Sequence, residues 1–175
     1  LPNFARLQRE GAWTHNARTD FDYTITLPNH TGMLTGRPVD DKLGLAGSGH
    51  HWATNITPLP GVTLHNTAGY YVASAFDVAH DNGLATGLYA SKEKFVLFDA
   101  SYDAGHGAPD AIYPDFGPDK IDTFVNFDLD SARTISDFLR NMAAAPSQYT
   151  FVHFNDADTA GHAAGWGGAE YAAAV

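Results

Sequence analysis

Two short segments of the sequence carry side chains that could act together on a phosphorus centre. The first is Thr-Leu-Pro-Asn-His at residues 26–30, which offers a hydroxyl just before a predicted helix. The second is Asp-Thr-Ala-Gly-His at residues 158–162, which offers a carboxylate and an imidazole at a spacing suited to metal ligands. An alcohol is a poor nucleophile at neutral pH, and a metal ion can activate it. If both segments lie at the same end of one sheet, they indicate metal-dependent attack on a phosphoester.

The position of Thr26 permits two interpretations. The helix predicted to begin near Pro28 leaves backbone N–H groups free in its first turn, so a phosphate oxygen could bind beside the hydroxyl. Threonine is also a common N-terminal cap of helices, and spacing alone favours that role. The sequence leaves both interpretations open.

Asp158 and His162 follow a predicted strand at residues 149–154. Ligands of α/β sheets bind beyond the carboxyl ends of the strands, so this position suits a metal site. Two ligands do not complete a site, and Asp156 is a competing carboxylate two residues earlier. Taken alone, the segment fits a polar loop as well as it fits a metal site.

Other polar residues form weaker patterns. His50 and His51 stand in a glycine-rich loop, where paired histidines can bind metal but more often are solvated. The nearby Asn55 could donate its amide to a developing negative charge. His106 and His153 have no distinctive spacing. An acidic run lacks the spacing of a calcium loop, and we interpret it as solvated. The run comprises Asp99, Asp103, Asp110, Asp115, Asp119 and Asp122.

Helical and strand-like patterns alternate along the chain, which predicts an α/β fold with a mainly parallel sheet. The predicted helices span residues 2–10, 28–35, 72–82 and 130–145, and another begins at 169. The predicted strands span residues 20–25, 85–90 and 149–154. Two stretches rich in Gly, Pro and polar residues, at about 37–68 and 99–122, are predicted to be irregular inserts.

Composition excludes several classes of protein. The 175 residues, 44% hydrophobic and 17% charged, suit one folded domain. Ten Lys and Arg against 20 Asp and Glu give a net charge of −10, which argues against wrapping of nucleic acid. An acidic protein that binds phosphate needs local cations, and metal ions would supply them. No apolar run approaches the length of a membrane span.

The sequence has no cysteine, so it can form neither disulfides nor a thiolate zinc site. Absence of cysteine fits an extracytoplasmic bacterial protein, although many cytosolic proteins also lack it. We therefore expect a periplasmic or secreted location.

The order of the candidate segments resembles the alkaline phosphatase superfamily, and most closely its type I phosphodiesterase/nucleotide pyrophosphatase branch. Members show a T-x-P-N-H…T-G segment, an H-G-x-x-x-N loop and a P-D-x-x-G-H segment. Here these correspond to residues 26–36, 50–55 and 157–162, with His51 and Ala157 in place of the glycine and the proline. Residues 1–11 are similar to the family's first helix. The resemblance implies a three-layer sandwich around a mainly parallel sheet, alkaline-phosphatase-like and partial, as a single domain over residues 1–175.

Carried over to this sequence, the resemblance makes Thr26 the nucleophile and a ligand of one metal ion. Asn55 would hold a non-bridging phosphoryl oxygen, and Asp158 and His162 would ligate the other ion. Attack by Thr26 on a small phosphoester would give a phospho-threonine, which water then hydrolyses. The implied cofactors are two divalent ions, zinc first, with manganese or iron as alternatives.

Several functions share this set of residues. A phosphodiesterase, a phosphatase, a phosphonate hydrolase and a phosphomutase would use the same metal chemistry, whereas the nucleophile segment of sulfatases is missing. An alternative from another class is a non-catalytic α/β binding domain that kept the fold without a complete metal site. An unrelated α/β domain with matching motifs is the third possibility.

The resemblance also places ligands outside this sequence. The family's first metal-binding aspartate precedes a helix like residues 1–11, and its later Asp-His pair and last histidine follow the position of Val175. We therefore expect a piece of a larger hydrolase that is inactive alone.

Zinc titration of the 175-residue chain should show no tight two-ion site, because only three of the family's metal ligands are present: Thr26, Asp158 and His162. Isothermal titration calorimetry would measure this. Stoichiometric binding of two zinc ions would contradict the expectation.

Overall fold

A computed structural model describes residues 2–42 and 44–175 of the chain as an α/β structure. Leu1 and Leu43 lie outside the described residues. Leu1 is the first residue of the segment 1–11 that is similar to the family's first helix. The strands are β1 (Thr86–Ala90), β2 (Thr123–Asn126) and β3 (Tyr149–His153). The helices are α1 (Pro2–Glu10), α2 (Thr26–Thr35), α3 (Leu64–Ala68), α4 (Ala75–Asp81), the 3₁₀ turn η1 (Glu93–Phe95), α5 (Val96–Tyr102), α6 (Ser131–Ala144), α7 (Asp156–Ala164) and α8 (Ala169–Ala174).

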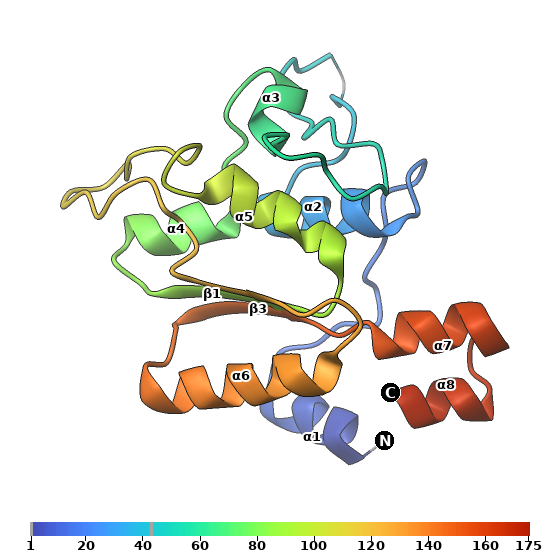
Figure 1. Ribbon diagram of the computed structural model, residues 1–175. Coiled ribbons are helices and arrows are strands. Elements are labelled where there is room, and N and C mark those ends of the chain that lie inside the picture. Colours follow the sequence, from blue (N-terminus) through green and yellow to red (C-terminus); the bar gives the residue numbers. More distant parts are fainter. Residues whose placement is uncertain (1, 43) are drawn as a thin grey trace.

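The three strands form one open parallel sheet in the order β2-β1-β3. Leu88 in the central strand stands opposite Phe124 of β2 and Phe151 of β3. Figure 1 shows α2, α4 and α5 on one face of this sheet and α6 on the other. The α/β fold with a parallel sheet, expected from the sequence, is therefore confirmed.

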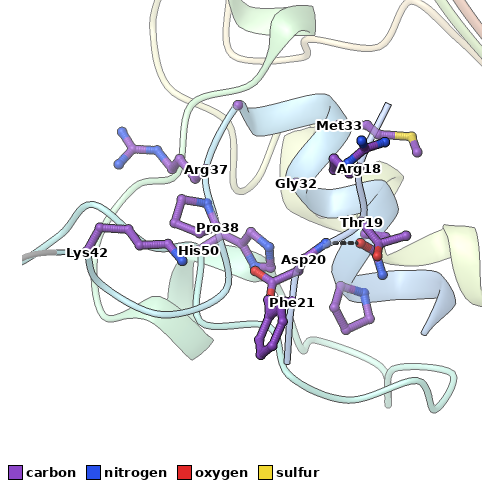
Figure 2. Close-up of a pocket in the computed structure, with 13 residues that line it drawn as sticks. Arg18, Thr19, Asp20, Phe21, Gly32, Met33, Arg37, Pro38, Lys42 and His50 are labelled. Carbon is purple, nitrogen blue, oxygen red and sulfur yellow. Dashed lines mark hydrogen bonds between the residues drawn. The ribbon is translucent and has the colours of Figure 1, made fainter. Parts of the chain in front are cut away.

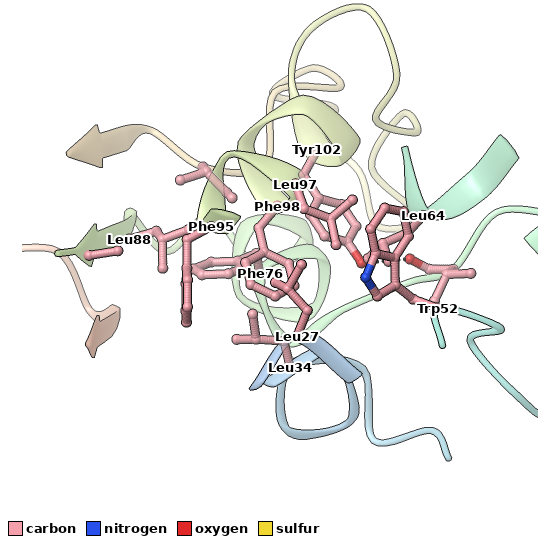
Figure 3. Close-up of a cluster of buried hydrophobic side chains, with 13 residues drawn as sticks. Leu27, Leu34, Trp52, Leu64, Phe76, Leu88, Phe95, Leu97, Phe98 and Tyr102 are labelled. Atoms are coloured by element: carbon pink, nitrogen blue, oxygen red, sulfur yellow. Dashed lines mark hydrogen bonds between the residues drawn. The ribbon is translucent and has the colours of Figure 1, made fainter. Parts of the chain in front are cut away.

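The main core lies between the sheet and the helices α2, α4 and α5 (Figure 3). Because side chains alternate along a strand, Leu88 enters this core whereas Tyr89 enters the opposite layer. There the Tyr89 ring packs on Phe138 of α6, with ring centroids 5.3 Å apart. Each fully buried large side chain contributes roughly 2 kcal/mol to folding. The largest fully buried apolar and aromatic side chains of this core are Tyr102, Phe76, Phe95, Phe98, Leu27, Leu34, Leu64, Leu88 and Leu97.

Local signals explain where several helices begin and end. Ser74 and Asp77 form a capping box at the start of α4, in which each side chain bonds the other residue's backbone N–H. Asp130 caps α6 by accepting a hydrogen bond from the N–H of Arg133. Gly36 ends α2 in the left-handed conformation, with φ of 67°. These helices lie close to their predicted positions.

The predicted strand at residues 20–25 is wrong. The segment pairs with no strand among the described residues, and Phe21 is 91% exposed. It is tied instead to α2, because the Asn29 amide donates hydrogen bonds to the carbonyls of Tyr23 and Ile25. Alternating apolar residues cannot make a strand without a neighbour to take up the backbone hydrogen bonds.

The sequence did not predict β2, η1, α3, α5 or α7. Each is short, and short elements carry too few residues for a clear period.

The predicted apolar face of α6 is also only partly covered, since Ile135 is 40% and Leu139 60% exposed. In residues 103–122, after α5, the structure has no helix or strand.

A buried lysine anchors this irregular segment. The ammonium of Lys120 pairs with the carboxylate of Asp110, and the carboxylate of Asp81 lies 3.4 Å away. His80 adds a hydrogen bond of 2.7 Å to Asp110. The backbone carbonyl of Lys120 accepts the hydroxyl of Thr86 at the start of β1. The segment is therefore fixed to the amino end of the sheet.

This cluster corrects the expectation that the whole acidic run is solvated. The Asp110 side chain is fully buried. Burial raises its pKa, but hydrogen bonds from Lys120 and His80 outweigh that effect and hold the pKa well below its usual range. Asp110 is thus an internal counter-ion of Lys120.

Replacing Asp110 with Asn should lower the free energy of unfolding by about 3 kcal/mol, because it leaves the buried ammonium of Lys120 without its main partner. Urea denaturation would measure the difference. The exposed pair Arg6–Glu10 provides a control, since Glu10→Gln should change stability by less than about 0.5 kcal/mol.

The loss of unfolding free energy in Asp110→Asn should also depend on pH. A carboxylate whose folded pKa is depressed stabilises the fold fully above its unfolded pKa, near the ordinary value of 3.8. That contribution is lost as the pH falls further, through the folded pKa. The difference between wild type and Asp110→Asn should therefore be full at neutral pH and shrink below about pH 4. A constant difference down to pH 2 would contradict this account.

Candidate active site at the carboxyl edge of the sheet

The carboxyl ends of β1 and β3 lie side by side and open into two segments that carry charged residues. Ala90 stands opposite His153 in the parallel register. Just beyond, the N–H of Ser91 donates to the carbonyl of His153, and the N–H of Asn155 donates to the hydroxyl of Ser91 over 2.8 Å. The turn after β1 and the start of α7 are therefore held together.

Thr26 is the first residue of α2 rather than its cap. The N-cap is Ile25, in an extended conformation and with no side-chain cap bond. The Thr26 hydroxyl makes no hydrogen bond to any residue that the structure describes, whereas its carbonyl lies 2.8 Å from Nδ1 of His30. The interpretation of Thr26 as a cap is thus wrong, and its hydroxyl is left free at the amino end of a ten-residue helix.

Asn55 docks directly beside Thr26. Its Oδ1 accepts a hydrogen bond of 3.0 Å from the N–H of Leu27, in the first turn of α2. Because an N–H group can only donate, this bond identifies the oxygen of the amide and leaves the Nδ2 donors for another partner. The carbonyl of Asn55 in turn accepts from Nζ of Lys94, 2.7 Å away.

Asp158 and His162 lie on one face of α7, four residues apart. Oδ1 of Asp158 and Nε2 of His162 are separated by 3.7 Å. Oδ2 of Asp158 accepts a hydrogen bond of 2.5 Å from Nζ of Lys92. Burial raises the Asp158 pKa, but Lys92 outweighs it, so the pKa lies below the usual value and the carboxylate is charged at neutral pH. Asp156, the competing carboxylate two residues earlier, is exposed and forms no ion pair within residues 2–42 and 44–175.

The glycine within this segment has a packing role. Gly161 is buried, and a Cβ placed there would stand 2.5 Å from the ring atoms Cε3 and Cζ3 of Trp166. Even alanine would therefore push the Trp166 ring away from α7. The Trp166 ring also meets the His162 ring edge-on at 5.6 Å between centroids, so Gly161 lets Trp166 support the imidazole.

Two histidines to which the sequence assigns no role, His30 and His153, also lie at this edge of the sheet. The rings of His30 and His153 meet edge-on, with centroids 5.0 Å apart, and both contact Phe95. Burial lowers the pKa of His153 to about 4, helped by His30 and Lys92 and opposed by Asp158. Burial likewise lowers the pKa of His30. Both imidazoles are neutral at pH 7.

A chain of contacts therefore leads from Thr26 to the turn that bears Lys92, the partner of Asp158. Thr26 is bonded to His30, His30 packs on His153, and the carbonyl of His153 is bonded to the turn that bears Lys92. Lys92 and Lys94 were also missed by the sequence reading. A signal for them existed, because they follow directly after a predicted parallel strand, where ligands of such sheets bind.

The fit of these residues to a metal ion is incomplete. A carboxylate and an imidazole four residues apart on a helix are suitable ligands of zinc and similar ions. Within residues 2–42 and 44–175, however, no three His, Asp or Glu side chains gather closely enough to hold one ion. Lys92 also occupies one oxygen of Asp158. The described residues thus supply two donors of a metal site.

The paired histidines do not form a metal site. His50 is fully buried, which corrects the expectation that it is solvated, and its Nδ1 accepts from the N–H of Trp52. Burial lowers the His50 pKa to about 4. His51 is turned to Asp41, with Nε2 and Oδ1 3.3 Å apart. The two imidazoles therefore have separate partners.

His50 lines a pocket of about 480 Å³ on another flank of α2 (Figure 2). The side of α2 that lines this pocket bears Pro28, Asn29 and Gly32. The adjacent side of the helix bears Thr26 and His30. The pocket also holds Asp20, whose carboxylate accepts the N–H groups of Asp22 and Val39. In Figure 2 the Arg37 side chain extends away from the other lining side chains, and its Nη1 donates to the Gly47 carbonyl. The residues that line this pocket include none of Thr26, Asn55, Asp158 and His162.

Comparison with known proteins shows the family to which the chain belongs. The model of one protein family, "Type I phosphodiesterase / nucleotide pyrophosphatase", matches residues 1–175. No curated protein and no solved structure is significantly similar to the chain. Because the family match spans the whole sequence, the protein belongs to the type I phosphodiesterase/nucleotide pyrophosphatase family of the alkaline phosphatase superfamily.

Proposed function

We propose that the protein is a metal-dependent phosphoester hydrolase that acts through a phospho-threonine at Thr26. Membership of the family supports hydrolysis of the phosphodiester or pyrophosphate type. The observation that carries the finer proposal is the free hydroxyl of Thr26 in the first turn of α2, with Asn55 bonded to the adjacent Leu27 N–H. A hydroxyl and an amide side chain then flank the first turn of α2.

The proposed reaction follows from these positions. The Thr26 hydroxyl loses its proton as its oxygen attacks phosphorus in line with the ester oxygen, so an Oγ1–P bond forms while the P–O bond to the leaving alcohol breaks. The departing oxygen takes up a proton, and water later cleaves the Oγ1–P bond and releases phosphate or a phosphomonoester. The Asn55 amide would donate to a non-bridging oxygen, whose negative charge grows in the transition state.

Asp158 and His162 would hold one of two divalent ions, and Thr26 would contact the other. Such ions, zinc first and manganese or iron as alternatives, would lower the pKa of the hydroxyl and neutralise charge on the phosphoryl group. The described residues complete neither site, so we also propose that the 175 residues alone are inactive and that further ligands come from outside them.

The proposed substrate is a small phosphoester. No helix within the described residues is long and apolar enough to cross a membrane. An extracytoplasmic location, suggested by the absence of cysteine, stays a proposal.

The second candidate is a non-catalytic domain that keeps the fold. Two observations favour it: Lys92 neutralises Asp158, and no third carboxylate or imidazole joins Asp158 and His162 in the part of the chain that the structure describes. The variants below distinguish the two candidates.

Thr26→Ala should abolish hydrolysis of bis-p-nitrophenyl phosphate, with a loss of about 10³-fold or more, because it removes the nucleophile. The assay uses the protein expressed from its natural open reading frame. Thr24→Ala is the matched control, since Thr24 is exposed and precedes the helix. Treatment with EDTA should also stop the reaction, and zinc should restore it.

An acid quench during turnover should trap a phosphoryl group on the peptide that contains Thr26, and mass spectrometry would detect it. Activity that survives in Thr26→Ala would refute the nucleophile assignment. Absence of activity in the wild-type protein would favour the non-catalytic candidate.

Asn55→Ala should lower kcat by about 10²-fold while KM changes little, because its amide acts mainly on charge that develops in the transition state. Thermal unfolding should show only a small change, since one half-exposed hydrogen bond to Leu27 is lost. Steady-state kinetics of the full-length protein would measure both parameters. An increase in KM alone would instead assign Asn55 to ground-state binding.

A further inference from the structure

The first turn of α2 bears Thr26 but has no side-chain cap. The N-cap residue is Ile25, whose apolar side chain makes no cap hydrogen bond. Terminal turns of helices fray, because several of their backbone groups have no partner within the helix. A nucleophile in such a turn needs another restraint if its hydroxyl is to keep one direction.

His30 supplies a restraint from the next turn of the helix. Its Nδ1 lies 2.8 Å from the carbonyl oxygen of Thr26. A carbonyl oxygen can only accept a hydrogen bond, so Nδ1 carries the proton and donates it. In the neutral ring Nε2 then has no proton, and the tautomer of His30 is fixed. The bond joins the His30 side chain to the residue that bears the hydroxyl.

The His30 ring is itself held by other elements of the fold. It meets Phe95 of η1 and His153 of β3 edge-on, each with ring centroids 5.0 Å apart. Phe151 of β3 follows at 6.1 Å, also edge-on. An imidazole enclosed by three rings cannot turn freely, so its N–H keeps one direction. The carbonyl of Thr26 is therefore tied to the edge of the sheet and not to α2 alone.

We propose that His30 is a positioning residue, which holds the Thr26 carbonyl against the sheet edge and thereby fixes the first turn of α2 and the direction of the Thr26 hydroxyl. This inference rests on the proposed function and adds a residue to it. It needs no bound ion, because the carbonyl, the imidazole and the packing rings all belong to this chain. His30 makes and breaks no bond in the reaction.

The neighbours of Thr26 are restrained in the same way by two other side chains. The amide of Asn29 donates a hydrogen bond of 2.8 Å to the carbonyl of Ile25. On the other side, the N–H of Leu27 donates to Oδ1 of Asn55 over 3.0 Å. Each residue from 25 to 27 thus has one backbone group bonded to a different side chain, and His30 provides the bond at Thr26 itself.

Two variants separate the hydrogen bond of His30 from the packing of its ring. His30→Phe keeps a ring and removes the N–H, whereas His30→Asn removes the ring and places an amide N–H close to the position of Nδ1. In the protein expressed from its natural open reading frame, His30→Phe should lower kcat for bis-p-nitrophenyl phosphate about tenfold, with KM within about twofold. The reason is that a misplaced nucleophile slows the chemical step more than binding.

His30→Asn should show the opposite pattern. It should keep most of kcat, because the N–H to the Thr26 carbonyl is retained, and it should unfold at a lower urea concentration, because the ring contacts are lost. His106→Phe is the matched control, since His106 is an exposed histidine of the irregular segment 103–122. It should change neither kcat nor stability.

A second measurement needs no activity and uses the 175-residue chain. Because the Leu27 N–H is bonded to Asn55, its exchange with deuterated water reports opening of the first turn of α2. Relative to amides of α6, this exchange should be about tenfold faster in His30→Phe than in wild type, His30→Asn or His106→Phe. Nitrogen NMR of the wild-type chain should show the Nδ1–H tautomer of His30.

Three results would each overturn the proposal: an unchanged kcat in His30→Phe, equal relative exchange of Leu27 in His30→Phe and wild type, or an Nε2–H tautomer. A parallel loss of kcat and stability in both His30 variants would also overturn it, since His30 would then support the fold alone. Activity that survives in Thr26→Ala, or a wild type without activity, would instead refute the proposed function. The exchange of Leu27 would still decide whether His30 holds the turn.

Discussion

The hydroxyl of Ser91 is the contact on which the arrangement of the site depends. It is fully buried, accepts the N–H of Asn155 at 2.8 Å and shares a hydrogen bond of 2.8 Å with the hydroxyl of Ser131. Three segments therefore meet at one atom: the end of β1, the start of α7 and the first residue of α6. A buried hydroxyl that is fully paired favours one geometry, because any other would leave polar groups without partners. The approach of Lys92 to Asp158 follows from it.

The two lysines near the ends of β1, Lys120 and Lys92, differ in how deeply their ion pairs are buried. At the amino end, Lys120 is fully buried among Asp110, Asp81 and a carbonyl. At the carboxyl end, Lys92 pairs with one carboxylate among the described residues, that of Asp158, and its side chain is 16% exposed. The first lysine fixes an irregular segment to the sheet, and the second stands where ligands of parallel sheets bind.

Much of the fold could be predicted because its signals are local. The helix α6 and the strand β3 were predicted within a residue or two. An aspartate cap and a long helical pattern of apolar residues mark α6, and a run of β-branched and aromatic residues marks β3. Strand β2 was missed because four residues carry too little periodicity. The false strand at residues 20–25 had the right alternation, but pairing depends on a neighbour that no local pattern reveals.

For the site, the sequence by itself determined the chemical types and their order: a hydroxyl at Thr26, an amide at Asn55, and a carboxylate and an imidazole at residues 158 and 162. Their resemblance to a family followed from that order, and the family match over residues 1–175 confirms it. Only the tertiary structure decided that Thr26 is a helical residue with a free hydroxyl, that His50 is buried, and that Lys92 neutralises Asp158. The physical reason is that capping, burial and ion pairing depend on which distant segments meet, and here 66 residues separate the lysine from its carboxylate.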